Sequence, residues 1–161
     1  MVLLLNQQRT VWLPLRTMTK QVERLMACSG YGGWDIGVHF VDDQRIHNLN
    51  KQYRNKNKAT DILSFPFHQT RIPEIDLPKT PTEDERNLGD MFLAMPYILH
   101  QCRLENDLLP LHLPVLLTHG ICHLIGYDHE TDSDYVAMRK REFQILNRYY
   151  SNKTIKGDLG L

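Results

Sequence analysis

The chain has 161 residues, which suits one domain with a single core, and its 19 basic and 19 acidic side chains balance. Hydrophobic residues make up 42% and charged residues 24%, as in an ordinary soluble globular protein. Because the net charge is zero, any basic surface for nucleic acid must be local, and no apolar run is long enough to span a membrane. The three cysteines (Cys28, Cys102, Cys122) are widely spaced, which suits a reducing compartment.

The N-terminal segment allows two interpretations. Residues 2–5 and 11–15 have the apolar composition of strands, and an amphipathic helix is predicted over about 17–28. The first acidic residue is Glu23, and the excess of basic residues before it is shared by mitochondrial presequences. We favour a structured N-terminus over a cleavable signal.

The next segments alternate between strand and helix patterns. Apolar and polar residues alternate over 34–40, which predicts a strand, and Asp42 or Asp43 is placed to cap the helix that follows. Alternation over 60–67 predicts another strand, and Pro66 indicates that this strand ends near a sheet edge.

The second half of the chain begins with an irregular stretch. Residues 68–88 contain three prolines and mixed charges, which predicts a long surface loop. A strand over 88–94 is followed by helices that we expect Pro96 and Pro114 to open.

The last helix is predicted from a cap at 131–133 to about Tyr150, with acidic residues at its start as the helix dipole prefers. Residues 151–161 form a polar tail. The interleaved pattern predicts one α/β (α+β) domain over residues 1–150, with a small mixed sheet packed against helices.

A run of histidines, His119, His123 and His129, carries the strongest chemical signal. On a helix, the first two lie one turn apart on the same face, and Gly126 can end that helix so that the chain folds back to deliver His129. Three histidine ligands leave one tetrahedral zinc position open for water, which is typical of a catalytic site in a hydrolase. The surrounding residues are apolar, so this helix is central and buried, and unpartnered imidazoles there would be costly.

The same spacing occurs in metzincin peptidases, but these enzymes carry a glutamate general base directly after the first histidine. This chain has Gly120 there, and glycine cannot move a proton. Peptide hydrolysis is therefore disfavoured.

Several segments together resemble the YbeY endoribonuclease family over nearly the whole chain. The segments are the histidine motif at 119–129, Tyr53-Arg54 followed by Thr60-Asp61-Ile62-Leu63-Ser64-Phe65-Pro66, and Leu88-Gly89-Asp90. Details at 67–68 and 100–102 look closer to animal members than to bacterial ones.

The resemblance implies a four-stranded mixed sheet and one zinc ion held by His119, His123 and His129. It also implies a single-strand-specific endoribonuclease that acts on ribosomal RNA in maturation and ribosome quality control. Small ribosomal subunit proteins and an assembly GTPase are the implied partners. The mitochondrial matrix is the implied location, with the cytoplasm as the alternative.

Arg54 is the candidate for phosphate recognition, because a planar guanidinium grips phosphate bidentately. It lies in a locally basic stretch with Lys51, Lys56 and Lys58. For the three lysines, a functional role and a simple position at a solvated helix end explain the pattern equally well. The resemblance places the family's essential arginine at this position. The predicted catalytic residues are therefore Arg54, His119 and His123.

The general base stays open among four carboxylates. Asp61 and Asp90 match family positions at strand ends, and Asp128 lies between the glycine and the third histidine. Glu142 is on a helix face that should be inward, where it would orient a ring nitrogen of a histidine or pair with an arginine. The remaining histidines are expected to be ordinary, with no partner at ligand spacing: His39, His47, His68, His100 and His112.

Three functions remain after this reasoning. The first is a zinc-dependent endoribonuclease acting on ribosomal RNA precursors. The second is a metal-dependent hydrolase of another bond, such as a peptide. The third is a non-catalytic, zinc-stabilised assembly factor of the small ribosomal subunit.

Overall fold

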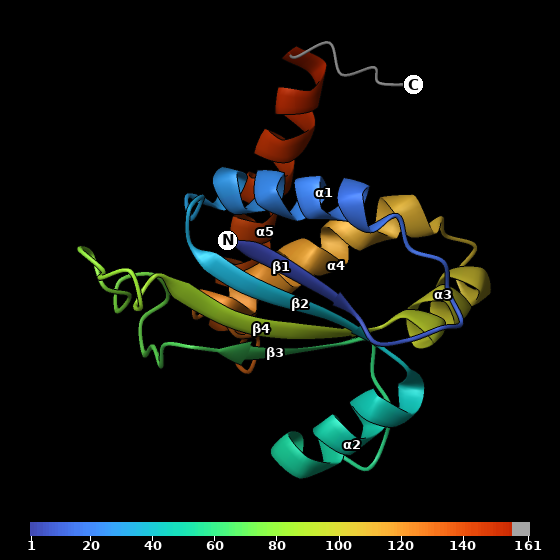
Figure 1. Cartoon of the computed structure of the whole chain (residues 1–161). Coiled ribbons are helices and arrows are strands. Elements are labelled where there is room, and N and C mark those ends of the chain that lie inside the picture. Colours follow the sequence, from blue (N-terminus) through green and yellow to red (C-terminus); the bar gives the residue numbers. More distant parts are fainter. Residues whose placement is uncertain (156–161) are drawn as a thin grey trace.

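Four strands form one mixed sheet in the order β1-β2-β4-β3 in the computed structural model, which describes residues 1–155 (Figure 1). β1, β2 and β4 run parallel, and β3 pairs antiparallel with β4 at the opposite edge from β1. The predicted small mixed sheet is therefore confirmed, with four strands as the family resemblance implied. The strands are β1 (Val2–Asn6), β2 (Asp35–Val41), β3 (Ile62–Pro66) and β4 (Asn87–Ala94).

Helices lie on both faces of this sheet (Figure 1). α1 and α4 cover one face, and α5 packs across both of them. α2 lies on the other face, over a small cluster of buried residues, and α3 follows directly after β4. The helices are α1 (Leu15–Ser29), α2 (Asp43–Arg54), α3 (Met95–Leu104), α4 (Leu109–Leu124) and α5 (Asp132–Ile155).

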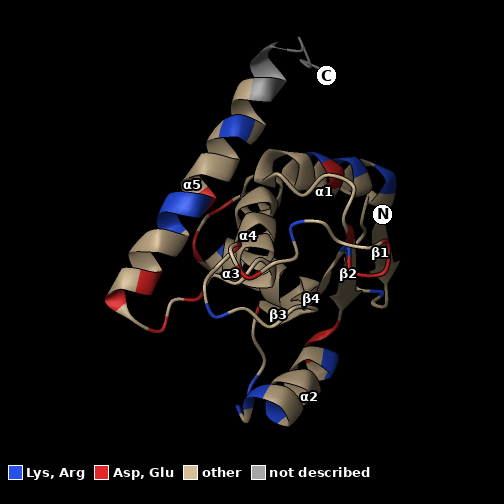
Figure 2. Cartoon of the chain, turned by 90° about the vertical axis from the view of Figure 1, so that its left-hand side faces the viewer, with Lys and Arg blue, Asp and Glu red and all other residues tan. Residues whose placement is uncertain are grey.

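Local signals in the sequence explain several of these boundaries. The carboxylate of Asp42 accepts the backbone N–H of Arg45 at 2.8 Å, as expected of the residue that caps α2. Pro96 lies in the first turn of α3, as predicted. α5 begins with Asp132 and Asp134 and carries basic residues further along, in the order that the helix dipole favours (Figure 2).

The start of α4 differs from the prediction. The helix begins at Leu109, with Pro110 in its first turn, so Pro114 lies inside the helix instead of opening it. Proline at this position removes only the bond to the carbonyl of Pro110, close to the helix start, and the rest of the helix continues. Burial of Pro114 helps to retain that extra turn.

Residues 11–15 form no strand, contrary to the prediction. The buried side chain of Gln8 bonds to both the N–H and the carbonyl of Val11, which holds this segment in a turn before α1. At the other end, α5 continues to Ile155, so the predicted tail begins inside a helix. Residues 156–161 of that tail lie outside the described residues.

α4 lies at the centre of the fold and contacts β3, β4, α1, α3 and α5. A Cβ added to Gly120 would lie 2.8 Å from Ile62 Cδ1 and 3.1 Å from Met91 Sδ. The glycine therefore allows the backbone of α4 to approach the sheet closely. Among the described helices, none combines the length and the apolar character needed to cross a bilayer.

Gly126 turns the chain sharply after α4. Its φ is +108°, a conformation that favours glycine, and an added Cβ would overlap Thr70 Oγ1 of the neighbouring loop. This turn directs the segment that carries His129 back toward the end of α4, as the sequence predicted.

We expect Gly126→Ala to lower the free energy of unfolding by about 1–3 kcal/mol, since both the backbone conformation and the contact with Thr70 would be strained. Urea unfolding measures this. Gly32→Ala is the matched control, because its Cβ would meet only ordinary contacts with Ala27. Equal stability of the two variants would contradict the role given to Gly126.

Candidate active site

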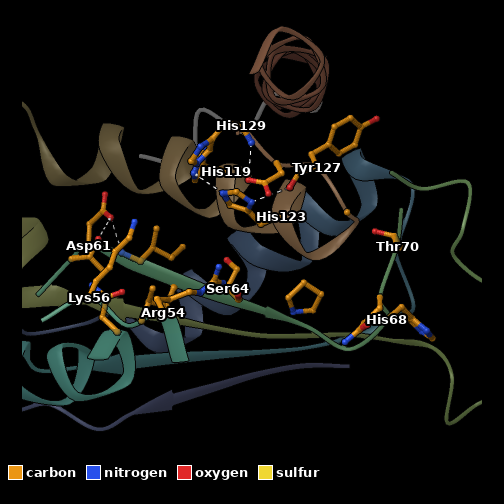
Figure 3. Close-up of a pocket in the computed structure, with 18 of the residues that line it drawn as sticks. Arg54, Lys56, Asp61, Ser64, His68, Thr70, His119, His123, Tyr127 and His129 are labelled. Carbon is orange, nitrogen blue, oxygen red and sulfur yellow. Dashed lines mark hydrogen bonds between the residues drawn. The ribbon is translucent and has the colours of Figure 1, made fainter. Parts of the chain in front are cut away.

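A cavity of about 670 Å³ opens beside the end of α4 and brings the predicted site residues together (Figure 3). Arg54 and Asp61 lie on one side, the three histidines line the top in this view, and His68 and Thr70 lie at the other end. The lining thus combines residues from α2, β3, α4 and the two loops that follow β3 and α4.

His119, His123 and His129 form a group that could hold a metal ion. One nitrogen from each ring lies within 4.8 Å of the others. The two Nε2 atoms of His119 and His123 are 3.1 Å apart, close to the separation of about 3.3 Å that two nitrogens have in a tetrahedral zinc site with bonds of about 2.0 Å.

The hydrogen bonds of the two helical histidines decide which nitrogens carry protons. Nδ1 of His123 is 2.9 Å from the carbonyl oxygen of Tyr127, which can only accept, so Nδ1 donates. Nδ1 of His119 likewise donates to the carboxylate of Glu142, at 3.1 Å. In neutral rings both Nε2 atoms then carry lone pairs that face each other, an arrangement that a bound cation would stabilise.

Glu142 occupies the inward position that its sequence predicted. Only 5% of the residue is exposed. Both expected partners are present, because one carboxylate oxygen accepts from His119 and the other lies 3.7 Å from the guanidinium of Arg139. The shorter bond, to the ring, fixes the orientation of His119.

His123 is held in the neutral form. Burial, followed by the neighbouring His119 ring, lowers its pKa from 6.5 to about 4. Its Nε2 lone pair is therefore available to a cation at neutral pH.

Arg54 is held at the cavity by β3. Its Nη2 donates to the backbone carbonyl of Ser64 at 2.8 Å, and its guanidinium lies 5.8 Å from the ring centre of Phe65. Lys56 and Lys58 line the same side, whereas Lys51 does not reach the cavity. Figure 2 shows this basic segment at the end of α2.

The four candidate carboxylates lie at different positions relative to the cavity. Asp61 and Asp128 line the cavity, and each uses Oδ1 to accept the backbone N–H of the following residue. Asp90 lies outside the cavity and pairs with His39 at 2.9 Å. Glu142 bonds to Nδ1 of His119 and is not part of the cavity lining.

A second network, which sequence reasoning missed, ties the loop after β3 to this site. Glu74 accepts hydrogen bonds from Tyr31, Tyr127 and Arg141, and its backbone N–H donates to the carbonyl of Ile125. Glu74 therefore connects the loop to the turn that carries the third histidine. Its partners come from distant parts of the chain, so no local spacing indicates them.

His68 also differs from the expectation that it would be ordinary, because it lines the cavity. Its Nε2 lies 2.7 Å from the carbonyl oxygen of Glu85, on the far side of the same loop. Ile62, Ser64 and Pro66 of the preceding strand also line the cavity. His68 continues this every-second-residue alternation, which would have placed it on the same face.

The chain is a small α/β protein with a four-stranded mixed sheet. Its central helix carries histidines of a group that could hold a metal ion, and this group shares one cavity with Arg54 and its basic surroundings. A profile of the family described as Endoribonuclease YbeY matches residues 4–150. The chain belongs to this family, which supports RNA-cleaving hydrolase activity.

Named relatives agree with that assignment, and one solved structure shares the fold. The chain is 38% identical over 145 residues to the Homo sapiens protein named Endoribonuclease YbeY, covering 88% of this chain and 84% of the relative. A Clostridioides difficile protein of the same name is 34% identical over 77% of this chain and 80% of its own. A solution structure from Thermotoga maritima, 21% identical, has a TM-score of 0.55 over 100% of this chain and 99% of its own, which supports the fold.

Metal-free protein should lose stability as the pH falls from 6.5 toward 4. The folded pKa of His123 is depressed, so in this window the unfolded chain binds a proton that the folded chain does not. The loss should reach on the order of 3 kcal/mol, since each pKa unit corresponds to about 1.4 kcal/mol. Urea unfolding across this range measures it. His123→Gln should flatten the pH dependence, and an unchanged slope would contradict the assignment.

Glu142→Gln should weaken the affinity of the three-histidine group for an added divalent ion, probed with zinc, about 10- to 100-fold, because the carboxylate orients His119 and raises the basicity of its ring. Competition with a chelator measures the affinity. Arg139→Gln is the matched control, since it removes the longer contact to the same carboxylate and should leave zinc affinity within about twofold. A larger loss in the arginine variant would show that the salt bridge dominates.

Proposed function

We propose that this protein is a zinc-dependent, single-strand-specific endoribonuclease that acts in ribosomal RNA maturation and ribosome quality control. The observation that carries the proposal is the presence of Arg54 and all three histidines at one open cavity. Membership of the endoribonuclease family supports the reaction class.

The residues that would hold one zinc ion are His119, His123 and His129, whose ring nitrogens lie close enough together for a shared cation. When bound, zinc would supply a Lewis acid for a phosphoryl oxygen and lower the pKa of a coordinated water. The carboxylate of Glu142 and the carbonyl of Tyr127 hold two of the rings in the required tautomer.

Arg54 would bind the phosphate whose bond is cleaved. Its hydrogen bond to Ser64 uses one end of the guanidinium and leaves the other N–H groups for phosphate oxygens. Positive charge placed there would stabilise the charge that builds on the equatorial oxygens in the transition state. Arg54 is thus an electrostatic catalyst, and Lys56 and Lys58 extend the basic surface along the RNA backbone.

Asp61 and Asp128 are the best candidates for the general base. Both line the cavity, and each engages Oδ1 with a backbone N–H, which leaves Oδ2 to accept a proton. Asp90 is a poorer candidate because it lies outside the cavity and pairs with His39. Glu142 is occupied by His119 and acts by positioning that ring.

The substrate proposed is single-stranded ribosomal RNA, with small ribosomal subunit proteins and an assembly GTPase as partners. The proposed location is the mitochondrial matrix. The similarity to the human relative supports choosing the location proposed for animal members of the family. Peptide hydrolysis stays disfavoured, because position 120, where metzincin peptidases carry their glutamate, is a glycine that packs closely against Ile62.

Arg54→Ala should reduce cleavage of single-stranded ribosomal RNA at least 100-fold while the fold and the zinc content are retained. His123→Ala should lose both zinc and cleavage, because it removes a ring at the centre of the group. Cleavage assays on metal-quantified protein, with circular dichroism, measure these effects.

Arg45→Ala is the control for the arginine variant, because Arg45 is exposed on the same helix and does not line the cavity. Equal cleavage by wild type and all variants would indicate a contaminating nuclease. That result would favour the non-catalytic assembly factor instead.

A further inference from the structure

The turn between α3 and α4 brings together a second group of side chains with metal-ligand chemistry. Cys102 on α3, Asp107 in the turn and His112 on α4 each offer one atom, and these atoms lie within 4.8 Å of one another. The expectation that His112 has no partner at ligand spacing is therefore wrong. The turn is held by a bond from the Asp107 N–H to the Cys102 carbonyl at 2.8 Å, which brings the two helix ends together.

Hydrogen bonds within the turn between α3 and α4 satisfy only some of the polar atoms of these three side chains. Oδ1 of Asp107 accepts the N–H of Leu108 at 2.8 Å, and Oδ2 lies 3.1 Å from Nδ1 of His112. Nε2 of His112 is buried and makes no hydrogen bond within the described residues. The thiol of Cys102 also makes none that the described part of the chain records, and the residue is only 2% exposed. Because Nδ1 donates to the Asp107 carboxylate, Nε2 is the nitrogen that keeps a lone pair, and a buried acceptor without a partner is costly.

We propose that Cys102, Asp107 and His112 bind a divalent cation of the zinc type, with water as the fourth ligand. A thiolate together with an imidazole selects zinc-like ions over magnesium or calcium, which prefer oxygen ligands. Binding replaces the proton of the Cys102 thiol with the metal ion and releases that proton to solvent, so the step needs no oxidant or reductant.

The geometry allows this with small movements. Bonds of about 2.0–2.3 Å place the ligand atoms of a tetrahedral zinc site about 3.3–3.6 Å apart. The present separations, up to 4.8 Å, require a contraction of no more than about 1.5 Å. The side chains of Asp107 and His112 are 38% and 20% exposed, so they can rotate and admit an ion from solvent.

The same exposures argue against a cysteine nucleophile assisted by the Asp107–His112 pair. The thiol is buried, so a substrate cannot reach it, whereas a small ion approaching past the two other side chains can. The bound ion would join α3 to the first turns of α4. His112 precedes His119 by seven residues, about 10 Å along the helix axis, so this site is separate from the three-histidine group.

Cobalt(II) is the probe that distinguishes the two sites. A thiolate ligand gives an intense near-ultraviolet charge-transfer absorption, and the three-histidine group contains no sulfur ligand. Reduced wild-type protein titrated with cobalt(II) should bind two equivalents and develop this band. Cys102→Ser should lose the band and one equivalent, and His112→Gln should weaken the band-forming site at least tenfold.

Cys28→Ser is the matched control, since it removes another buried cysteine and should leave the band unchanged. Folded wild-type protein that shows no thiolate band at saturating cobalt would overturn the proposal. Persistence of the band in both Cys102→Ser and His112→Gln would also overturn it, because the thiolate would then lie elsewhere. Neither result depends on RNA cleavage.

Discussion

The two imidazoles that face each other across one turn of α4 set the main constraint on this protein. Their Nδ1 atoms donate to Glu142 and to the Tyr127 carbonyl, so both Nε2 lone pairs converge at 3.1 Å in a partly buried position. That arrangement is costly without a cation. Glu142 on α5, the turn after α4 and His129 all surround or support this pair of rings, so their positions depend on one another.

β3 connects the three-histidine group to the basic surface formed by Arg54, Lys56 and Lys58. The hydroxyl of Ser64 donates to the carbonyl of Gly120, and its backbone carbonyl accepts from Arg54. One strand residue therefore links the arginine at the end of α2 to the helix that carries the histidines. Because Gly120 lets α4 pack closely on β3, the guanidinium and the histidines share one cavity. The glycine that replaces a peptidase's glutamate thus has a packing role as well as a chemical consequence.

The long loop after β3 is attached to the site by a half-buried ion pair and its hydrogen bonds. Glu74 bonds to Tyr127 and to Arg141, and Tyr127 also supplies the carbonyl that orients His123. Burial and the Glu74 carboxylate raise the pKa of the Tyr127 hydroxyl, which keeps it protonated as a donor. The loop therefore forms part of the wall of the cavity and supports the histidine turn.

From the sequence alone, local signals predicted the strands near 2–5, 34–40, 60–67 and 88–94, the cap at Asp42, the turn at Gly126 and the paired histidines on one helix face, but also a strand at 11–15 that does not form. The sequence also indicated that Glu142 is inward. Three features become clear only in the folded chain: which carboxylates reach the cavity, that α4 begins before Pro114, and that Cys102 lies near His112. These depend on contacts between different helices, strands and loops or on burial that outweighs local preference, and neither leaves a periodic pattern in the sequence.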